Sequence, residues 1–316
     1  MKRSMLMLLA WIGICAAVHA ADRDYHLDPL RVAPDVYVFI GKTEDFTTEN
    51  GGNIVNTGFI IAPQGVVVID TGPSLLYGRQ MRSAIARVTG KPVVMVINTH
   101  HHPDHFLGNQ AFSDVQIATL AGVQKGIAAE GNAFAENLFR MTGDWMAGTE
   151  VVAPSRTLEA GQVVIAGRSL RLLSLDGHTG ADLALIDETS GVLFAGDLVF
   201  NSRAPTTPHA DVEHWLSSLS ALEAVMAHGE AKVLVPGHGP VSRDAAAIGW
   251  TRDWLVWLTG SLRDAAEQGF DMNEALERTL PQRFLNVPLS RSEYRRSVLR
   301  LYPGIEETML AGARSE

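Results

Sequence analysis

One stretch, residues 99–105 (THHHPDH), constrains this chain more than any other part of its sequence. It follows an apolar, β-branched run (VVMVI), which predicts a buried strand. His100 and His102 are two residues apart in an extended segment, so their side chains point the same way and can share one ion. Asp104 and His105 follow a proline and can turn toward a second ion beside the first. Packing does not require this much imidazole and carboxylate at the end of a hydrophobic strand, and we predict a dinuclear metal site.

The composition is that of a globular protein with a surplus of acidic residues. Of the 316 residues, 46% are hydrophobic and 19% are charged, so we expect a packed core and no extensive disorder. The 26 Lys and Arg residues against 35 Asp and Glu residues give a formal charge of −9. Phosphate binding needs a basic face, so this balance excludes nucleic acid as a general partner.

Residues 1–20 have the pattern of a signal peptide: a basic start, an apolar run and a small residue, Ala20, at the expected cleavage point. The apolar run is short for a transmembrane helix, although a retained membrane anchor is the alternative. Cleavage near Ala20 removes two of the 26 basic residues, which leaves 24 against 35 acidic residues and a charge of −11. The single cysteine, Cys15, lies in this segment. We therefore expect a periplasmic or secreted protein without disulfides, held together by core packing and metal.

The order of predicted elements indicates an α/β protein built as an αββα sandwich. Two β-rich halves each alternate with helices, which would cover the outer faces of the two sheets. Beyond residue 240 the pattern is helical. We predict a signal peptide at residues 1–20, one domain at 21–245, and a helical C-terminal extension at 246–316 packed on the same domain. The predicted strands lie at residues 36–40, 53–61, 65–70, 93–97, 115–118, 151–152, 162–165, 170–175, 183–187, 192–195 and 233–235.

Residues 120–147 are predicted to be mainly helical. Phe134, Leu138 and Met141 recur at helical spacing, and a buried helix face is the ordinary explanation. A lid over the active site is the alternative, although lids are more often loops or weakly packed segments.

Three further metal-ligand residues, His178, Asp197 and His238, follow apolar runs in the second half of the chain. Each has glycine next to it, which lets the backbone turn sharply and present the side chain at the edge of a sheet. Loops at one end of a rigid scaffold commonly carry the chemistry of a protein. Imidazoles with carboxylates suit Zn²⁺ better than other first-row divalent ions.

These motifs together resemble the metallo-β-lactamase superfamily, in order and over residues 34–242. The resemblance implies the αββα fold and two Zn²⁺ per chain, with iron as the alternative metal. It implies that Asp70 supports the metal-binding loop from behind, and that Asp197 bridges the two ions. The remaining ligands that it implies are His100, His102 and His178 for the first ion and Asp104, His105 and His238 for the second.

Asp197 indicates which branch of the superfamily the chain resembles, because the best-known class B β-lactamases carry cysteine or serine at this position. An aspartate here resembles the glyoxalase II and general hydrolase branches. Residues 178–182 (HTGAD) and 194–200 (FAGDLVF), with the leader, resemble exported zinc hydrolases associated with quinoprotein relay and sulfur-oxidation systems. A periplasmic quinoprotein dehydrogenase system is therefore an expected partner.

The predicted function is hydrolysis of a small acyl substrate. Two adjacent dications lower the pKa of a shared water, and the resulting bridging hydroxide would attack the carbonyl of an ester, thioester, lactone or β-lactam. Asp104 would be catalytic, orienting this hydroxide and receiving its proton. The alternative is a di-iron redox protein, or a metal-bound accessory protein of a periplasmic quinoprotein or sulfur-oxidation system. Neither the substrate nor the oligomeric state follows from these motifs.

Four other polar residues near the motifs have weaker predictions. His101 should point away from the ions that its neighbours bind. His209 is expected to line the substrate pocket. Arg203 could meet an anionic substrate or be an ordinary solvated arginine. Asp182 is expected to accept a hydrogen bond from an imidazole and fix its orientation.

Overall fold

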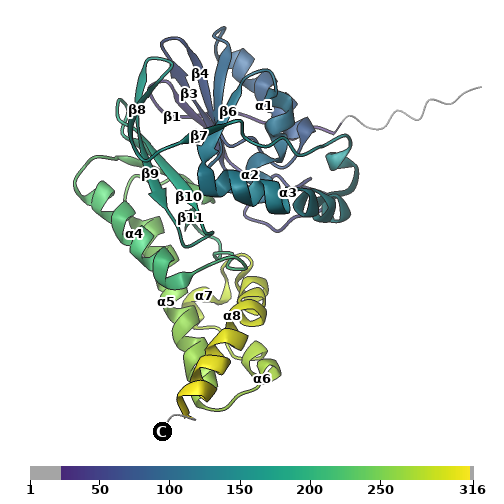
Figure 1. The fold of residues 1–316 in the computed structure, drawn as a ribbon, viewed down its shortest axis with the longest axis vertical. Helices are drawn as coiled ribbons and strands as arrows, with labels where there is room; N and C mark the ends of the chain where they lie inside the picture. The colour runs from purple at the N-terminus through teal and green to yellow at the C-terminus, as the bar shows by residue number, and fades with distance from the viewer. Residues whose placement is uncertain (1–22, 314–316) are drawn as a thin grey trace, which may run out of the picture.

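The computed structural model describes residues 23–313 and shows two β-sheets packed face to face, with helices on both outer faces (Figure 1). The αββα prediction is confirmed. The predicted signal peptide, residues 1–20, lies outside the described residues. Among the helices of the described part, none has the length and apolar character needed to cross a membrane.

The first sheet contains the strands of the N-terminal half in chain order, β1 to β7. The pairs from β1 to β4 are antiparallel, and those from β4 to β7 are parallel. Its strands are β1 (Leu30–Ala33), β2 (Val36–Phe39), β3 (Thr57–Ala62), β4 (Gly65–Ile69), β5 (Val93–Ile97), β6 (Gln116–Leu120) and β7 (Arg156–Leu158).

The second sheet has the order β12-β11-β10-β9-β8. Its neighbours are antiparallel except for β11 and β12, which run parallel. Its strands are β8 (Gly161–Ile165), β9 (Arg168–Leu175), β10 (Asp182–Asp187), β11 (Val192–Phe200) and β12 (Val233–His238).

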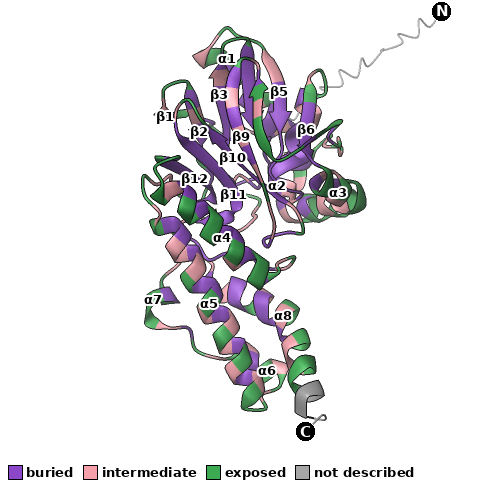
Figure 2. Cartoon of the chain, turned by 60° about the vertical axis from the view of Figure 1, so that its left-hand side comes forward, coloured by how far each residue is buried: buried purple, intermediate pink, exposed green. Residues whose placement is uncertain are grey.

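Helices cover both sheets, and those after β12 extend beyond the sandwich (Figure 2). Between strands β4 and β7 of the first sheet, the chain forms α1 (Leu75–Val88), α2 (Pro103–Phe106), η1 (Leu107–Phe112), α3 (Ala121–Thr142) and η2 (Gly143–Met146). In the second half, α4 (Val212–Ala227) lies between β11 and β12, and β12 is followed by α5 (Ala246–Glu267), α6 (Met272–Leu276), α7 (Gln282–Leu285) and α8 (Ser290–Ala313).

Alternation along the strands produces the layers, since successive side chains point to opposite faces of a sheet. In β4, Val67 and Ile69 belong to the core between the sheets, whereas Val66 and Val68 belong to the core under α1. In β10, Leu185 faces the other sheet, while its neighbours face the core under α4 and α5. Both faces of these two strands are therefore buried, and the polar ends of the strands are left for function.

One predicted strand, Val151–Val152, does not form. These residues have no ladder partner, and the pairing with β6 begins only at Arg156. The carbonyl of Val152 accepts a hydrogen bond from the side-chain amide of Asn109 at 3.0 Å instead. The two valines pack against different cores, so their apolar character reflected burial and not strand pairing.

Candidate metal centre

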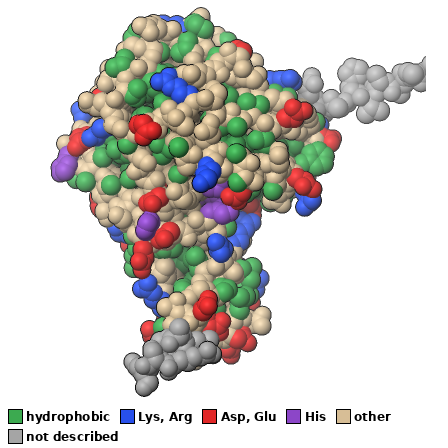
Figure 3. Space-filling model, in the orientation of Figure 1, with side chains coloured by type: hydrophobic (Ala, Val, Ile, Leu, Met, Phe, Trp, Pro, Cys, Tyr) green, Lys and Arg blue, Asp and Glu red, His purple; other side chains and the backbone are tan. Residues whose placement is uncertain are grey.

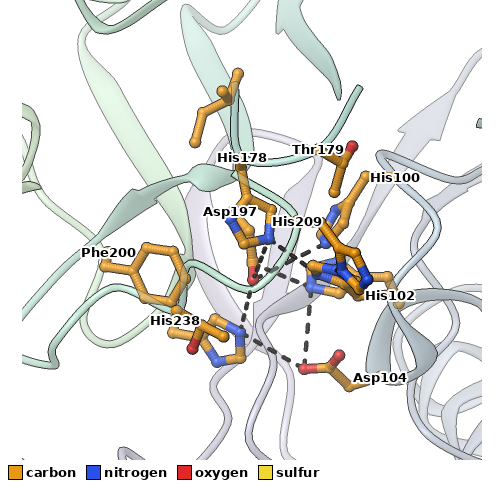
Figure 4. Close-up of polar contacts among 12 residues, drawn as sticks. His100, His102, Asp104, His178, Thr179, Asp197, Phe200, His209 and His238 are labelled. Atoms are coloured by element: carbon orange, nitrogen blue, oxygen red, sulfur yellow. Dashed lines mark hydrogen bonds and ion pairs between the residues drawn. The ribbon is translucent and has the colours of Figure 1, made fainter. Parts of the chain in front are cut away.

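The seven predicted donors meet at one edge of the sandwich, between the two sheets (Figure 4). The loop after β5 and helix α2 supply four of them, the turn after β9 supplies His178, and β11 and β12 carry Asp197 and His238. The strand predicted at residues 192–195 would end before Asp197, and this is wrong, because β11 continues to Phe200. The strand is instead irregular here: Gly196 has φ 53° and the register with β12 shifts on both sides of it. A bulge of this kind redirects a side chain without ending the strand.

The first group of donors is His100, His102, His178 and Asp197, whose ligand atoms lie within 4.8 Å of one another. Nε2 of His178 is 2.9 Å from Nδ1 of His102. Oδ2 of Asp197 is 3.5 Å from Nε2 of His178 and 3.9 Å from Nε2 of His100. Three imidazoles and one carboxylate oxygen therefore converge on one point.

The second group is Asp104, His105 and His238, on the other side of Asp197. Oδ2 of Asp104 lies 3.5 Å from Nε2 of His238 and 4.0 Å from Nε2 of His105. The two oxygens of Asp197 reach both histidines, at 3.1 Å from Nε2 of His105 and 3.1 Å from Nε2 of His238. Asp197 is thus the residue that the two groups share.

The donor atoms themselves fit metal ions. Nε2 of His100, Nε2 of His105 and Oδ1 of Asp197 are buried and make no hydrogen bond within the described residues. Buried polar atoms are normally satisfied, so unpaired donors that converge on one point indicate an ion site. The structure brings together all seven predicted residues, and their role as ligands stays a prediction.

Hydrogen bonds at the Nδ1 atoms of His105 and His238 determine which ring nitrogen faces the centre. Nδ1 of His238 donates to the carbonyl of Ile54 at 2.7 Å, and Nδ1 of His105 lies 2.8 Å from Oδ2 of Asp70. Each ring therefore presents Nε2 to the centre, as outer partners of metal-binding histidines commonly arrange. Asp70 also accepts hydrogen bonds from the backbone N–H and the hydroxyl of Thr99, both at 2.8 Å, so it joins the two ends of the loop.

The electrostatics leave most imidazoles neutral and the central carboxylate ionised. Burial lowers the pKa of His178 to about 3 and that of His100 well below its ordinary value. Burial opposes ionisation of Asp197, but His238 and His105 hold its pKa well below the usual range. Burial likewise opposes the charge on His105, but the carboxylates of Asp197 and Asp70 raise its pKa well above the ordinary value. Neutral imidazoles and an ionised carboxylate are the forms that bind metal.

Asp182 acts on the backbone and not on an imidazole, contrary to the prediction. Its Oδ2 accepts hydrogen bonds from the backbone N–H groups of His178 at 3.1 Å and Thr179 at 2.9 Å. Its Oδ1 accepts one from the hydroxyl of Thr179 at 2.9 Å. Burial raises the pKa of Asp182 to about 7. The carboxyl group fixes the turn that carries His178.

A pocket of about 310 Å³ opens onto both groups. Phe134 and Met141 of α3 line one side, while other residues of the same helix are buried in the core, so α3 is a packed helix that also forms a pocket wall. His209 lines the pocket, as predicted. Arg203 is not a solvated loop residue: it is 3% exposed, and its NH2 group lies 3.6 Å from Oε1 of Glu293.

Helix α8 holds the loop that follows β11, which carries Arg203 and His209. Oγ of Ser297 is 2.6 Å from Oγ1 of Thr207. Nε of Arg300 donates to the carbonyl of Pro208 at 2.7 Å, and the hydroxyl of Thr206 donates to Glu293 at 3.1 Å. The C-terminal helices therefore support the wall of the pocket, which sequence reasoning missed because no motif marks these residues.

Comparison with known proteins places the chain in a family. The metallo-beta-lactamase superfamily profile matches residues 50–238, more than half of the chain, and the chain belongs to this superfamily. In structure it resembles a metallo-beta-lactamase from Pontibacter korlensis, with a TM-score of 0.59 and 22% identity over 73% of this chain and 99% of that one.

The curated relatives are hydrolases. A linear primary-alkylsulfatase from Pseudomonas sp. (strain ATCC 19151) is 24% identical over 78% of this chain, which spans 54% of that protein. The acyl-coenzyme A thioesterase MBLAC2 of Gallus gallus is 27% identical over 59% of this chain and 73% of its own length. A hydroxyacylglutathione hydrolase from Polaromonas sp. (strain JS666 / ATCC BAA-500) is 31% identical over 49% of this chain and 52% of its own length. The chain is thus a member of a hydrolase family.

Proposed function

We propose that this protein is an exported dinuclear zinc hydrolase that cleaves a small acyl substrate, an ester, thioester, lactone or β-lactam. One observation carries the proposal: two groups of metal-ligand side chains lie side by side and share the carboxylate of Asp197. The thioesterase and the hydroxyacylglutathione hydrolase among the relatives support an acyl substrate.

Each group has the donors for one ion. His100, His102 and His178 would hold the first, and Asp104, His105 and His238 the second, with Asp197 between them. Two zinc ions bound in this way would lower the pKa of a water molecule toward neutrality and polarise an acyl carbonyl.

The chain's own residues would position the reactants and move the proton. Asp104 lines the pocket and is 4% exposed, so its carboxylate can accept a proton from the attacking water without competition from bulk solvent. Phe134 and Met141 offer an apolar surface for the acyl group beside the donors. The hydrogen bonds behind His105 and His238 hold their rings in place during the reaction.

The leader and the flanking motifs support a more specific assignment. Residues 1–20 support export to the periplasm or beyond, with cleavage near Ala20. Residues 178–182 and 194–200 support the quinoprotein-relay and sulfur-oxidation subgroup, with a periplasmic quinoprotein dehydrogenase system as partner. The mature chain is proposed to be one domain at residues 21–245 with the helical extension 246–316 packed on it.

Elemental analysis of the purified mature chain tests the proposal, on the same sample that is assayed against ester, thioester, lactone and β-lactam substrates. About two zinc per chain with hydrolysis of an acyl substrate would support it. Iron without hydrolysis would contradict it in favour of the redox alternative. Two zinc without turnover of any acyl class would contradict the substrate assignment.

Asp104→Asn tests the catalytic assignment. In the zinc-loaded variant we expect turnover to fall roughly 10²- to 10⁴-fold, because the amide cannot accept the proton. Circular dichroism should show an unchanged fold. Asp144→Asn is the matched control, since among residues 23–313 the side chain of this exposed carboxylate pairs only with Arg23, and it lies outside the pocket lining. Unchanged turnover in metal-loaded Asp104→Asn would remove Asp104 from the mechanism.

A further inference from the structure

A second cluster of metal-ligand residues lies beside the candidate metal centre and uses none of its donor atoms. It consists of His101, His209 and Glu130, from the loop after β5, the loop after β11 and helix α3. Nε2 of His101 is 3.5 Å from Oε1 of Glu130, and Nε2 of His209 is 3.5 Å from Oε2 of the same carboxylate. The centroids of the two imidazole rings are 5.6 Å apart.

The two imidazole–carboxylate separations of 3.5 Å are long for hydrogen bonds and close to the separation of two ligands of one ion. Strong hydrogen bonds to a carboxylate are shorter than about 3.0 Å. Two ligands at zinc–ligand distances of about 2.0–2.1 Å in a tetrahedral site lie roughly 3.3 Å apart. Within residues 23–313, Glu130 has no Lys or Arg within ion-pair distance, and its two oxygens face the two imidazoles. A carboxylate with two imidazoles is an ordinary ligand set for zinc.

The surrounding contacts hold the two rings in this arrangement. The ring of His101 lies against α3 at Gly126, where a Cβ atom would come within 2.7 Å of it. Nδ1 of His209 lies 2.8 Å from Nε2 of His102. A neutral His102 ring that binds an ion through Nδ1 has its hydrogen on Nε2, from which it would donate to His209. Nε2 of His209 is left to face Glu130.

Ions in solution can reach the cluster. The side chains of Glu130 and His209 are 44% and 35% exposed, whereas that of His101 is 10% exposed. Histidine side chains reach the surface in the region between the sandwich and the C-terminal helices (Figure 3). The cluster thus combines one buried and two accessible donors at the rim of the pocket that His209 lines.

We propose that His101, His209 and Glu130 form a third metal site, which binds a divalent transition ion such as zinc. An ion at this site lies at the pocket rim and is joined to the first donor group through His209 and His102, so its binding lowers turnover. The occupancy of the site is independent of the proposed function, and only the effect on turnover rests on it.

Zinc titration of the full mature chain tests the proposal, by calorimetry and by elemental analysis after equilibrium dialysis. Glu130→Gln removes the shared carboxylate and touches none of the seven donors. Glu136→Gln is the matched control, because this glutamate is on the same helix and its side chain pairs only with Arg140 in the described part of the chain. We expect the wild type and Glu136→Gln to bind one zinc more per chain than Glu130→Gln.

The inhibition of turnover by excess zinc provides the second measurement. Glu130→Gln should raise the zinc concentration for half-inhibition by more than about tenfold, since one ligand of the set is lost. Equal zinc binding by wild type and Glu130→Gln would overturn the proposal. A wild type that binds a single zinc, lost in Glu130→Gln, would support the third site while contradicting the proposed function.

Discussion

The two halves of the candidate metal centre are built in opposite ways. The first sheet contributes four donors from one segment of six residues, 100–105, which runs from the loop after β5 into α2. The second sheet contributes three donors from three separate places, the turn after β9, strand β11 and the end of strand β12, spread over residues 178–238. We call the four donors of residues 100–105 the local half and His178, Asp197 and His238 the distributed half. The local half depends on the conformation of one short segment. The distributed half forms only when the strands of the second sheet have their native register.

Close backbone packing maintains the distributed half. Strands β11 and β12 run so near each other that a Cβ atom on Gly237 would lie 1.9 Å from Oδ1 of Asp197. At the end of β9, a Cβ on Gly177 would lie 2.2 Å from the backbone of Trp215. In this half, glycines at close backbone contacts position the donors together with the side-chain hydrogen bonds of Asp182 and His238.

The largest effect should come from Asp197→Asn, because this one residue of the distributed half contacts histidines of both donor groups. We expect zinc affinity at both groups to fall by more than the roughly 100-fold typical for outer-shell partners. Chelator competition on the mature chain measures it. If only one zinc is lost and the other keeps its affinity, the two donor groups bind independently, and Asp197 does not couple them.

A smaller effect is expected from Gly237→Ala, which changes no donor. The added methyl group cannot fit beside Asp197, so unfolding free energy should fall by about 1–3 kcal/mol and zinc affinity should fall with it. Urea denaturation and chelator competition measure the two changes. Gly260→Ala is the control, since this glycine of α5 has open space around it and alanine should stabilise the helix by roughly 0.5–1 kcal/mol. A Gly237→Ala protein that resembles the control would show that the distributed half tolerates movement.

The smallest effect concerns His214 of α4, at the outer surface near the turn that carries His178. A hydrogen bond to Asp176, with Nδ1 and Oδ2 2.9 Å apart, raises the pKa of this exposed imidazole. Since the folded pKa lies above the unfolded one, the pair stabilises the fold fully below about pH 6.5 and loses this contribution as pH rises through the folded pKa. An NMR titration should show His214 above its ordinary pKa, and Asp176→Asn should lower it. Asp176→Asn should leave the zinc affinity unchanged. A change in zinc affinity would show that the contact between His214 and Asp176 at the surface also helps to position His178.

The difference between the local and the distributed half also explains which parts of the fold and site could be predicted from the sequence. The local half was recognisable because its four donors are neighbours in the chain, and the fold because buried strands alternate with helices. The positions of Glu130 and Glu293 could not be predicted, since packing of α3 and α8 brings them against His209 and Arg203 of the pocket wall and no spacing marks them. Asp182 was assigned to an imidazole because its sequence position does not distinguish a backbone acceptor from a side-chain acceptor.

The contacts of α8 with the loop after β11 also bear on the order in which the protein is made. Synthesis runs from the N-terminus, so all seven donors leave the ribosome before Glu293, Ser297 and Arg300. The donors can therefore be assembled in a nascent chain whose pocket wall still lacks its support. The candidate donors are therefore complete in the chain before the helix that supports the pocket wall has been made.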